Sequence, residues 1–140
     1  PILGEVTSVE MSDDGRQLLT SSKDNSHRLW DMRMLRPLQR FKGHQNTSKN
    51  FIRCTFAHPS LIVSGSEDGL VYMWGQESSL ALQTLKGHGT DSHPAAATVG
   101  GRKQVVVYSA AWNKVQGLLA SCADDGTVRL WDWTPPHDAP

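Results

Sequence analysis

The amino-acid sequence predicts an all-β fold built from three consecutive copies of one antiparallel four-stranded unit. A tryptophan closes an apolar alternation three times, at Trp30, Trp74 and Trp131. An Asp stands six residues before each of these tryptophans, and a Ser or Thr stands four residues before each Asp. Three matches at fixed offsets indicate an internal repeat, and no stretch of useful length has helical periodicity.

Short apolar stretches separated by turn residues predict the strands of the first unit. The expected strands are residues 6–9, 17–20, the stretch ending at Trp30, and 38–41. The turns between them contain Asp13-Asp14-Gly15 and Asp24-Asn25, which suit tight reversals of the chain.

The second and third units repeat this order. Expected strands are residues 51–56, 61–64, the Trp74 strand and 82–85 in the second unit, then 105–112, 118–121 and the Trp131 strand in the third. The predicted boundaries are residues 1–43, 44–87 and 88–134 for the three units and 135–140 for a tail. We expect a core role for Phe51 and Tyr72, since both fall on predicted strands.

Dipeptides at the unit boundaries carry a family resemblance. Gly43-His44 and Gly87-His88 open units, while Trp30-Asp31 and Trp131-Asp132 close them. With these motifs the sequence resembles the WD-repeat family, which implies β-propeller blades; Gly75 departs from the closing Asp. Because three blades cannot close a ring, we expect either the C-terminal blades of a longer propeller or self-association of short chains.

His, Ser and Asp recur together and allow two interpretations. They have the composition of a hydrolase site, but a catalytic site is needed once, whereas these residues return with each unit. The resemblance implies a buried hydrogen-bonded tetrad within each blade, so we expect no enzyme and no catalytic residue. The tetrads would be His44/Ser64/Asp68/Trp74 and His88/Ser121/Asp125/Trp131, with a partial set Thr20/Asp24/Trp30.

Composition narrows the classes of partner. Lys and Arg together number 14 and so do Asp and Glu, which gives no reason to expect nucleic acid. Neither Cys54 nor Cys122 belongs to a CxxC pair, and the histidine spacing predicts no metal site; we expect no cofactor. No apolar stretch is long enough for a membrane span, and we expect an intracellular protein of the cytoplasm, the nucleus or both.

The resemblance implies a non-enzymatic scaffold or adaptor whose rim loops bind other proteins. The third unit carries about a dozen extra residues before its Asp, so loop 89–103 is either a binding loop or disordered. Candidate partner-binding residues are Arg33, His93, Arg102, Lys103 and Trp133.

Two alternatives remain open. Residues 18–33, closing in Trp30-Asp31-Met32-Arg33, resemble the pattern with which WD-repeat substrate receptors dock on cullin-type ubiquitin ligases. A chromatin subunit that binds a histone tail would instead use acidic loop residues, namely Asp13, Asp14, Glu67 and Asp124.

Overall fold

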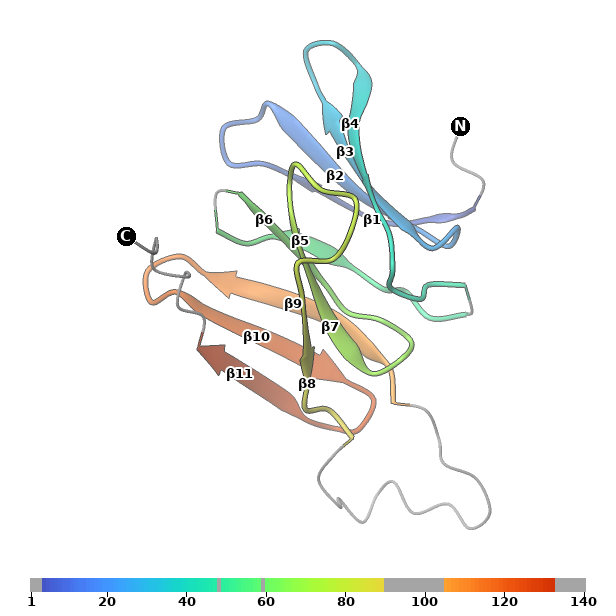
Figure 1. Cartoon of the computed structure of the whole chain (residues 1–140), viewed down its shortest axis with the longest axis vertical. Coiled ribbons are helices and arrows are strands. Elements are labelled where there is room, and N and C mark those ends of the chain that lie inside the picture. The colour runs from blue at the N-terminus through green and yellow to red at the C-terminus, as the bar shows by residue number, and fades with distance from the viewer. Residues whose placement is uncertain (1–3, 48, 59, 90–104, 133–140) are drawn as a thin grey trace.

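Three antiparallel β-sheets, arranged side by side, make up the structure (Figure 1). It is a computed structural model that describes residues 4–47, 49–58, 60–89 and 105–132. The first sheet contains β1 (Val6–Met11), β2 (Gln17–Ser22), β3 (Ser26–Asp31) and β4 (Arg36–Phe41). The second contains β5 (Cys54–Phe56), β6 (Leu61–Ser64), β7 (Leu70–Gly75) and β8 (Gln83–Lys86), and the third β9 (Val107–Asn113), β10 (Leu118–Ala123) and β11 (Val128–Asp132). The prediction of an all-β fold is confirmed.

The strand register repeats from sheet to sheet. Trp30 lies opposite Leu18, Trp74 opposite Ile62, and Trp131 opposite Leu119, each partner standing two residues before the repeated Ser or Thr. The three units are therefore copies in register as well as in sequence. Among the described residues, no helix is long and apolar enough to cross a membrane.

Packing between the sheets follows from the alternation of side chains along each strand. Ile62 faces the first sheet, where it joins a buried cluster with Leu19, Leu29, Phe41, Cys54 and Trp74. Its neighbour Val63 faces the third sheet, where it joins Val71, Met73, Val107 and Leu119. The second sheet is thus covered on both faces.

Backbone contacts hold the second and third sheets together. Ser66 forms an isolated β-bridge with Val107, and the Arg53 N–H donates to the Tyr108 carbonyl at 2.9 Å. Gly65 lies so close that a Cβ there would sit 2.1 Å from the Val107 carbonyl oxygen. Only a glycine fits this approach.

Strand β5 is shorter than the predicted 51–56, and the core role expected for Phe51 is wrong. Phe51 precedes the strand and is 61% exposed, with the Lys23 ammonium 5.1 Å from its ring centroid. The cause is the Arg53 N–H, which bonds to Tyr108 of β9 instead of to β6. The chain therefore begins its pairing with β6 only at Cys54.

Candidate functional site

The polar residues predicted to form the third tetrad lie together. Ser121 Oγ accepts the Trp131 indole N–H at 2.8 Å and lies 2.8 Å from His88 Nε2. The other ring nitrogen of His88 lies 3.1 Å from Asp125 Oδ2. Because His88 follows β8, this network links the end of the second sheet to β10 and β11.

Asp125 is the most heavily bonded member of this network. Burial acts to raise its pKa, but hydrogen bonds from Thr127, the Gly89 N–H and His88 outweigh burial and lower it to about 2. The Gly89 N–H donates to Asp125 Oδ2 at 2.9 Å, and a Cβ on Gly89 would lie 2.7 Å from Val105 Cγ2. Gly89 and Val105 are therefore neighbours in space.

The first unit brings together part of its predicted set. Trp30 Nε1 donates to Thr20 Oγ1 at 2.9 Å. Asp24 instead accepts hydrogen bonds from Arg28 Nη2 at 2.8 Å and Ser26 Oγ at 2.6 Å. The Asp therefore holds its own turn and strand β3.

The structure does not bring the second predicted tetrad together. Trp74 Nε1 donates to the Lys42 carbonyl at 3.0 Å, and Ser64 Oγ donates to the Gly65 carbonyl at 2.8 Å. Two side chains peculiar to this region explain the departure. The Tyr72 hydroxyl donates to Asp68 Oδ2 at 2.6 Å, and the His27 ring stacks on His44 at 3.8 Å between centroids.

The stacked histidines are buried, and within the part of the chain that the structure describes neither ring nitrogen of His27 or His44 has a hydrogen-bond partner. Burial lowers the pKa of His44 to about 4 and that of His27 well below its usual value. Both rings are therefore neutral at pH 7, and both pack against Trp74 with their planes nearly perpendicular to the indole.

The hydroxyl groups of Ser64 and Ser121 and the thiol of Cys54 are buried. Ser121 and Ser64 are 2% and 0% exposed, so neither hydroxyl is open to a substrate. Burial raises the pKa of the Cys54 thiol to about 12, which keeps it protonated and unreactive. Within the described ranges, no group of three or more His, Cys, Asp or Glu side chains could hold a metal ion.

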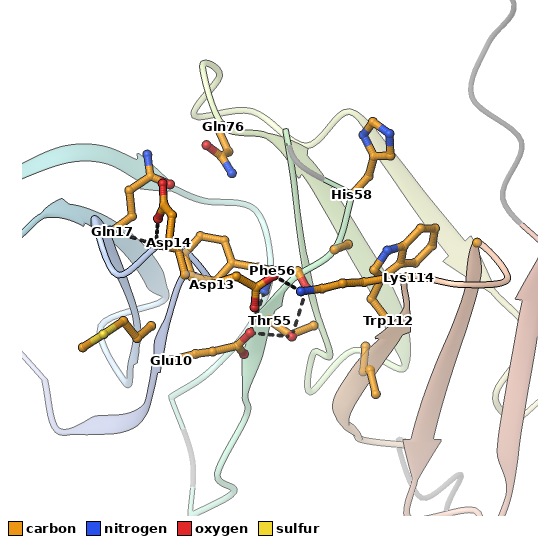
Figure 2. Close-up of a pocket in the computed structure, with 16 residues that line it drawn as sticks. Glu10, Asp13, Asp14, Gln17, Thr55, Phe56, His58, Gln76, Trp112 and Lys114 are labelled. Atoms are coloured by element: carbon orange, nitrogen blue, oxygen red, sulfur yellow. Dashed lines mark hydrogen bonds and ion pairs between the residues drawn. The ribbon is translucent and has the colours of Figure 1, made fainter.

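A groove of about 840 Å³ opens at one end of the three sheets (Figure 2). The β1–β2, β5–β6 and β9–β10 turns meet there because the first strands of the sheets, β1, β5 and β9, lie side by side. We call this feature the rim groove; its main lining side chains are Glu10, Met11, Asp13, Asp14, Phe56, His58, Gln76, Trp112 and Lys114. It draws on all three units.

Polar contacts between units fix the walls of the rim groove. Glu10 Oε1 accepts hydrogen bonds from Thr55 Oγ1 at 3.1 Å and the Phe56 N–H at 3.3 Å, which joins β1 to β5. Asp13 forms an ion pair with Lys114, which joins the first unit to the third (Figure 2). Hydrogen bonds from Ser12 and the Arg16 N–H lower the pKa of Asp14.

Sequence reasoning missed the floor of the rim groove, although a signal existed. Met11 lies opposite Leu18, Phe56 opposite Ile62, and Trp112 opposite Leu119, which is one repeat position in all three sheets. Met11 and Trp112 each stand nine residues before the repeated Thr20 or Ser121, whereas Phe56 stands eight before Ser64, so the shared position becomes visible only when the second unit is given a one-residue gap.

Arg33 is exposed in the β3–β4 turn, whose shape Asp31 stabilises. Asp31 Oδ1 accepts the N–H groups of Arg33 and Met34 at 2.8 and 2.9 Å. Within the described ranges, the Arg33 side chain forms no ion pair. The other candidate partner-binding residues, namely His93, Arg102, Lys103 and Trp133, lie outside the described residues.

The four acidic residues proposed for a histone tail do not share a surface. Asp13 and Asp14 lie in the β1–β2 turn at the rim groove, whereas Glu67 and Asp124 lie in turns at the opposite end of their sheets. There Glu67 accepts the Thr47 N–H at 3.2 Å and Asp124 the Val106 N–H at 2.8 Å. Glu67 and Asp124 therefore hold neighbouring backbone segments in place.

Comparison with known proteins gives consistent matches. The family model described as "WD domain, G-beta repeat" matches residues 3–31, 35–75 and 95–132. The WD repeat-containing protein WDS homolog of Arabidopsis thaliana is 34% identical over 94% of the chain and 23% of its own length.

Two further relatives match to a similar degree. The WD repeat-containing protein 26 homolog of Arabidopsis thaliana is 32% identical over 90% of the chain and 19% of its own length. GID complex subunit 7 of Schizosaccharomyces pombe is 31% identical over 91% of the chain and 22% of its own length. The chain spans about a fifth of the length of these curated relatives.

Proposed function

The chain belongs to the WD-repeat family, and from this premise we propose that it is a non-catalytic scaffold that holds a partner protein in its rim groove. Its three sheets are blades of the WD-repeat type. Proteins of this family generally serve as interaction scaffolds, and one relative is by name a subunit of a complex.

The observation that carries the proposal is the rim groove itself. It combines an apolar floor, in which Met11 is 54% exposed, with polar walls that are already fixed by hydrogen bonds and an ion pair. Interfaces bury aromatic and apolar anchors inside a polar border, and a groove that is formed before binding loses little entropy when the partner arrives.

A site-specific photo-crosslinking residue tests the location. Placed at His58, inside the rim groove, it should form covalent adducts with other proteins in cells under ultraviolet light. The matched control places the same residue at Lys49, which is exposed outside the groove lining. Adducts at position 49 but not at position 58 would place the contact elsewhere and contradict the proposal.

The exposed Arg33 favours a second candidate function, that of a substrate receptor for a cullin-type ubiquitin ligase. A guanidinium that is not already paired can bind carboxylates or carbonyls on a partner with two parallel hydrogen bonds. Capture of a cullin adaptor by the wild-type chain, and its loss with Arg33→Ala but not with Arg36→Ala, would support this function. Equal capture by both variants would exclude Arg33 as the contact.

A further inference from the structure

The floor and wall of the rim groove form a composite surface. Phe56 and Trp112 occupy the same repeat position in adjacent sheets and both line the groove. Glu10 lines the same groove, and one of its carboxylate oxygens accepts hydrogen bonds from the Phe56 N–H and from Thr55. Figure 2 shows Glu10, Phe56 and Trp112 at the same groove. An acidic group therefore lines the same groove as two aromatic side chains.

The charges of the rim groove do not cancel. Three carboxylates line it, those of Glu10, Asp13 and Asp14, against one ammonium, that of Lys114. Lys114 forms an ion pair with Asp13, although both side chains are largely exposed and water screens this pair. Arg16 approaches Asp14 only at 4.0 Å, and both side chains are largely exposed, so water screens this pair. The groove keeps an excess of negative charge, centred on Glu10 and Asp14.

A Lys or Arg side chain has the chemistry that complements this surface. Its aliphatic stem packs on apolar and aromatic groups, and its cationic end is attracted both by aromatic faces and by a carboxylate. Glu10 is already held in place from the neighbouring sheet, so binding would not have to order it. Nucleic acid and acidic peptides would be repelled.

We propose that the rim groove binds a basic segment of a partner protein, with a Lys or Arg side chain over Phe56 and Trp112 and its charge at Glu10. This inference rests on the proposed function, since it names the chemistry of the partner for the same groove. It makes Glu10 the residue that selects for positive charge.

A displayed library of random peptides tests the inference with the whole chain as bait. Glu10→Gln removes the charge and keeps the size of the side chain. Glu5→Gln makes the same change beside the other end of β1, where, as far as the described residues go, Glu5 pairs only with Lys23 and lines no part of the groove. Ala111→Phe fills the groove from an exposed position on β9. Circular dichroism should first verify that all three variants are folded.

We expect peptides selected by the wild type and by Glu5→Gln to be enriched in Lys or Arg over the unselected library. Selected peptides should bind Glu10→Gln about tenfold more weakly, the factor for one lost charge-assisted hydrogen bond, and should not bind Ala111→Phe. Replacing the selected Arg by citrulline, which has the same shape without the charge, should weaken binding to the wild type and to Glu5→Gln but not to Glu10→Gln.

The outcomes separate the inference from the function on which it rests. Peptides that need an open groove but show no Lys or Arg enrichment, or that bind Glu10→Gln as well as wild type, would overturn the inference and leave the scaffold proposal standing. Peptides that bind Ala111→Phe as well as wild type, or a library that yields no binder, would count against both.

Discussion

Replacing Ser121 with Ala should destabilise the protein much more than replacing Ser64, although the two residues occupy the same repeat position. The Ser121 hydroxyl, 2% exposed, is the shared partner of the Trp131 N–H and His88 Nε2, at 2.8 Å each. Its removal leaves both groups without a partner inside the protein. At about 1–3 kcal/mol for each buried unpaired group, and with Trp131 only partly buried, we expect a loss of about 2–3 kcal/mol.

Among the residues that the structure describes, the Ser64 hydroxyl forms no hydrogen bond with an indole or imidazole. It donates to the Gly65 carbonyl at 2.8 Å and the Arg53 carbonyl at 3.2 Å, so Ser64→Ala removes a donor and should cost about 1 kcal/mol. Urea unfolding followed by tryptophan fluorescence measures both losses, and an unchanged slope with denaturant shows that the unfolding reaction is the same. Equal losses for the two variants would refute the inference that the two networks differ.

The remaining predictions concern pH, charge and backbone contacts. Since the pKa of His44 is about 4 in the folded chain and 6.5 is its ordinary value, the unfolded chain binds more protons between these values. His44 alone should therefore lower stability by about 3 kcal/mol as the pH drops from 6.5 to 4. Burial lowers the pKa of His27 too, so urea titrations of His27→Val, which introduces the residue found at positions 71 and 128, should show a shallower fall. In a double-mutant cycle, Asp13→Asn and Lys114→Ala should reveal a coupling of about 1 kcal/mol or less that weakens with added salt; a larger, salt-independent coupling would contradict this. Gly65→Ala should cost about 3 kcal/mol or more in thermal or urea unfolding because its Cβ meets the Val107 carbonyl, whereas Gly75→Ala, with nothing within 4 Å, should stay within about 1 kcal/mol of wild type.

The repeat could be predicted from the sequence because equal spacing of Trp and Ser or Thr determines how the strands pair. Once Trp131 and Ser121 are aligned with Trp30 and Thr20, the pairing of β10 with β11 and of β2 with β3 follows, and so does the indole hydrogen bond. These contacts lie within one sheet. Local spacing is sufficient to place them.

The second unit shows where such reasoning stops. Its Ser, Asp and Trp have the same spacing as in the third unit, yet the Tyr72 hydroxyl binds Asp68 and the His27 ring stacks on His44. His27 belongs to the first sheet, so its effect on His44 depends on how the sheets pack. The Glu10–Thr55 bond and the Asp13–Lys114 ion pair also cross between sheets, which is why the rim groove was not predicted.

The closeness of Gly89 and Val105 has a consequence for the divergence of these proteins. The two residues flank residues 90–104, and hydrogen bonds hold the chain to the turn of the third unit on either side: the Gly89 N–H donates to Asp125, and the N–H of Val106, next to Val105, donates to Asp124. A connection whose ends are pinned together costs little to lengthen, about 0.6 kcal/mol for each doubling of its length. The number of residues between Gly89 and Val105 can therefore change during evolution without altering the sheets on either side.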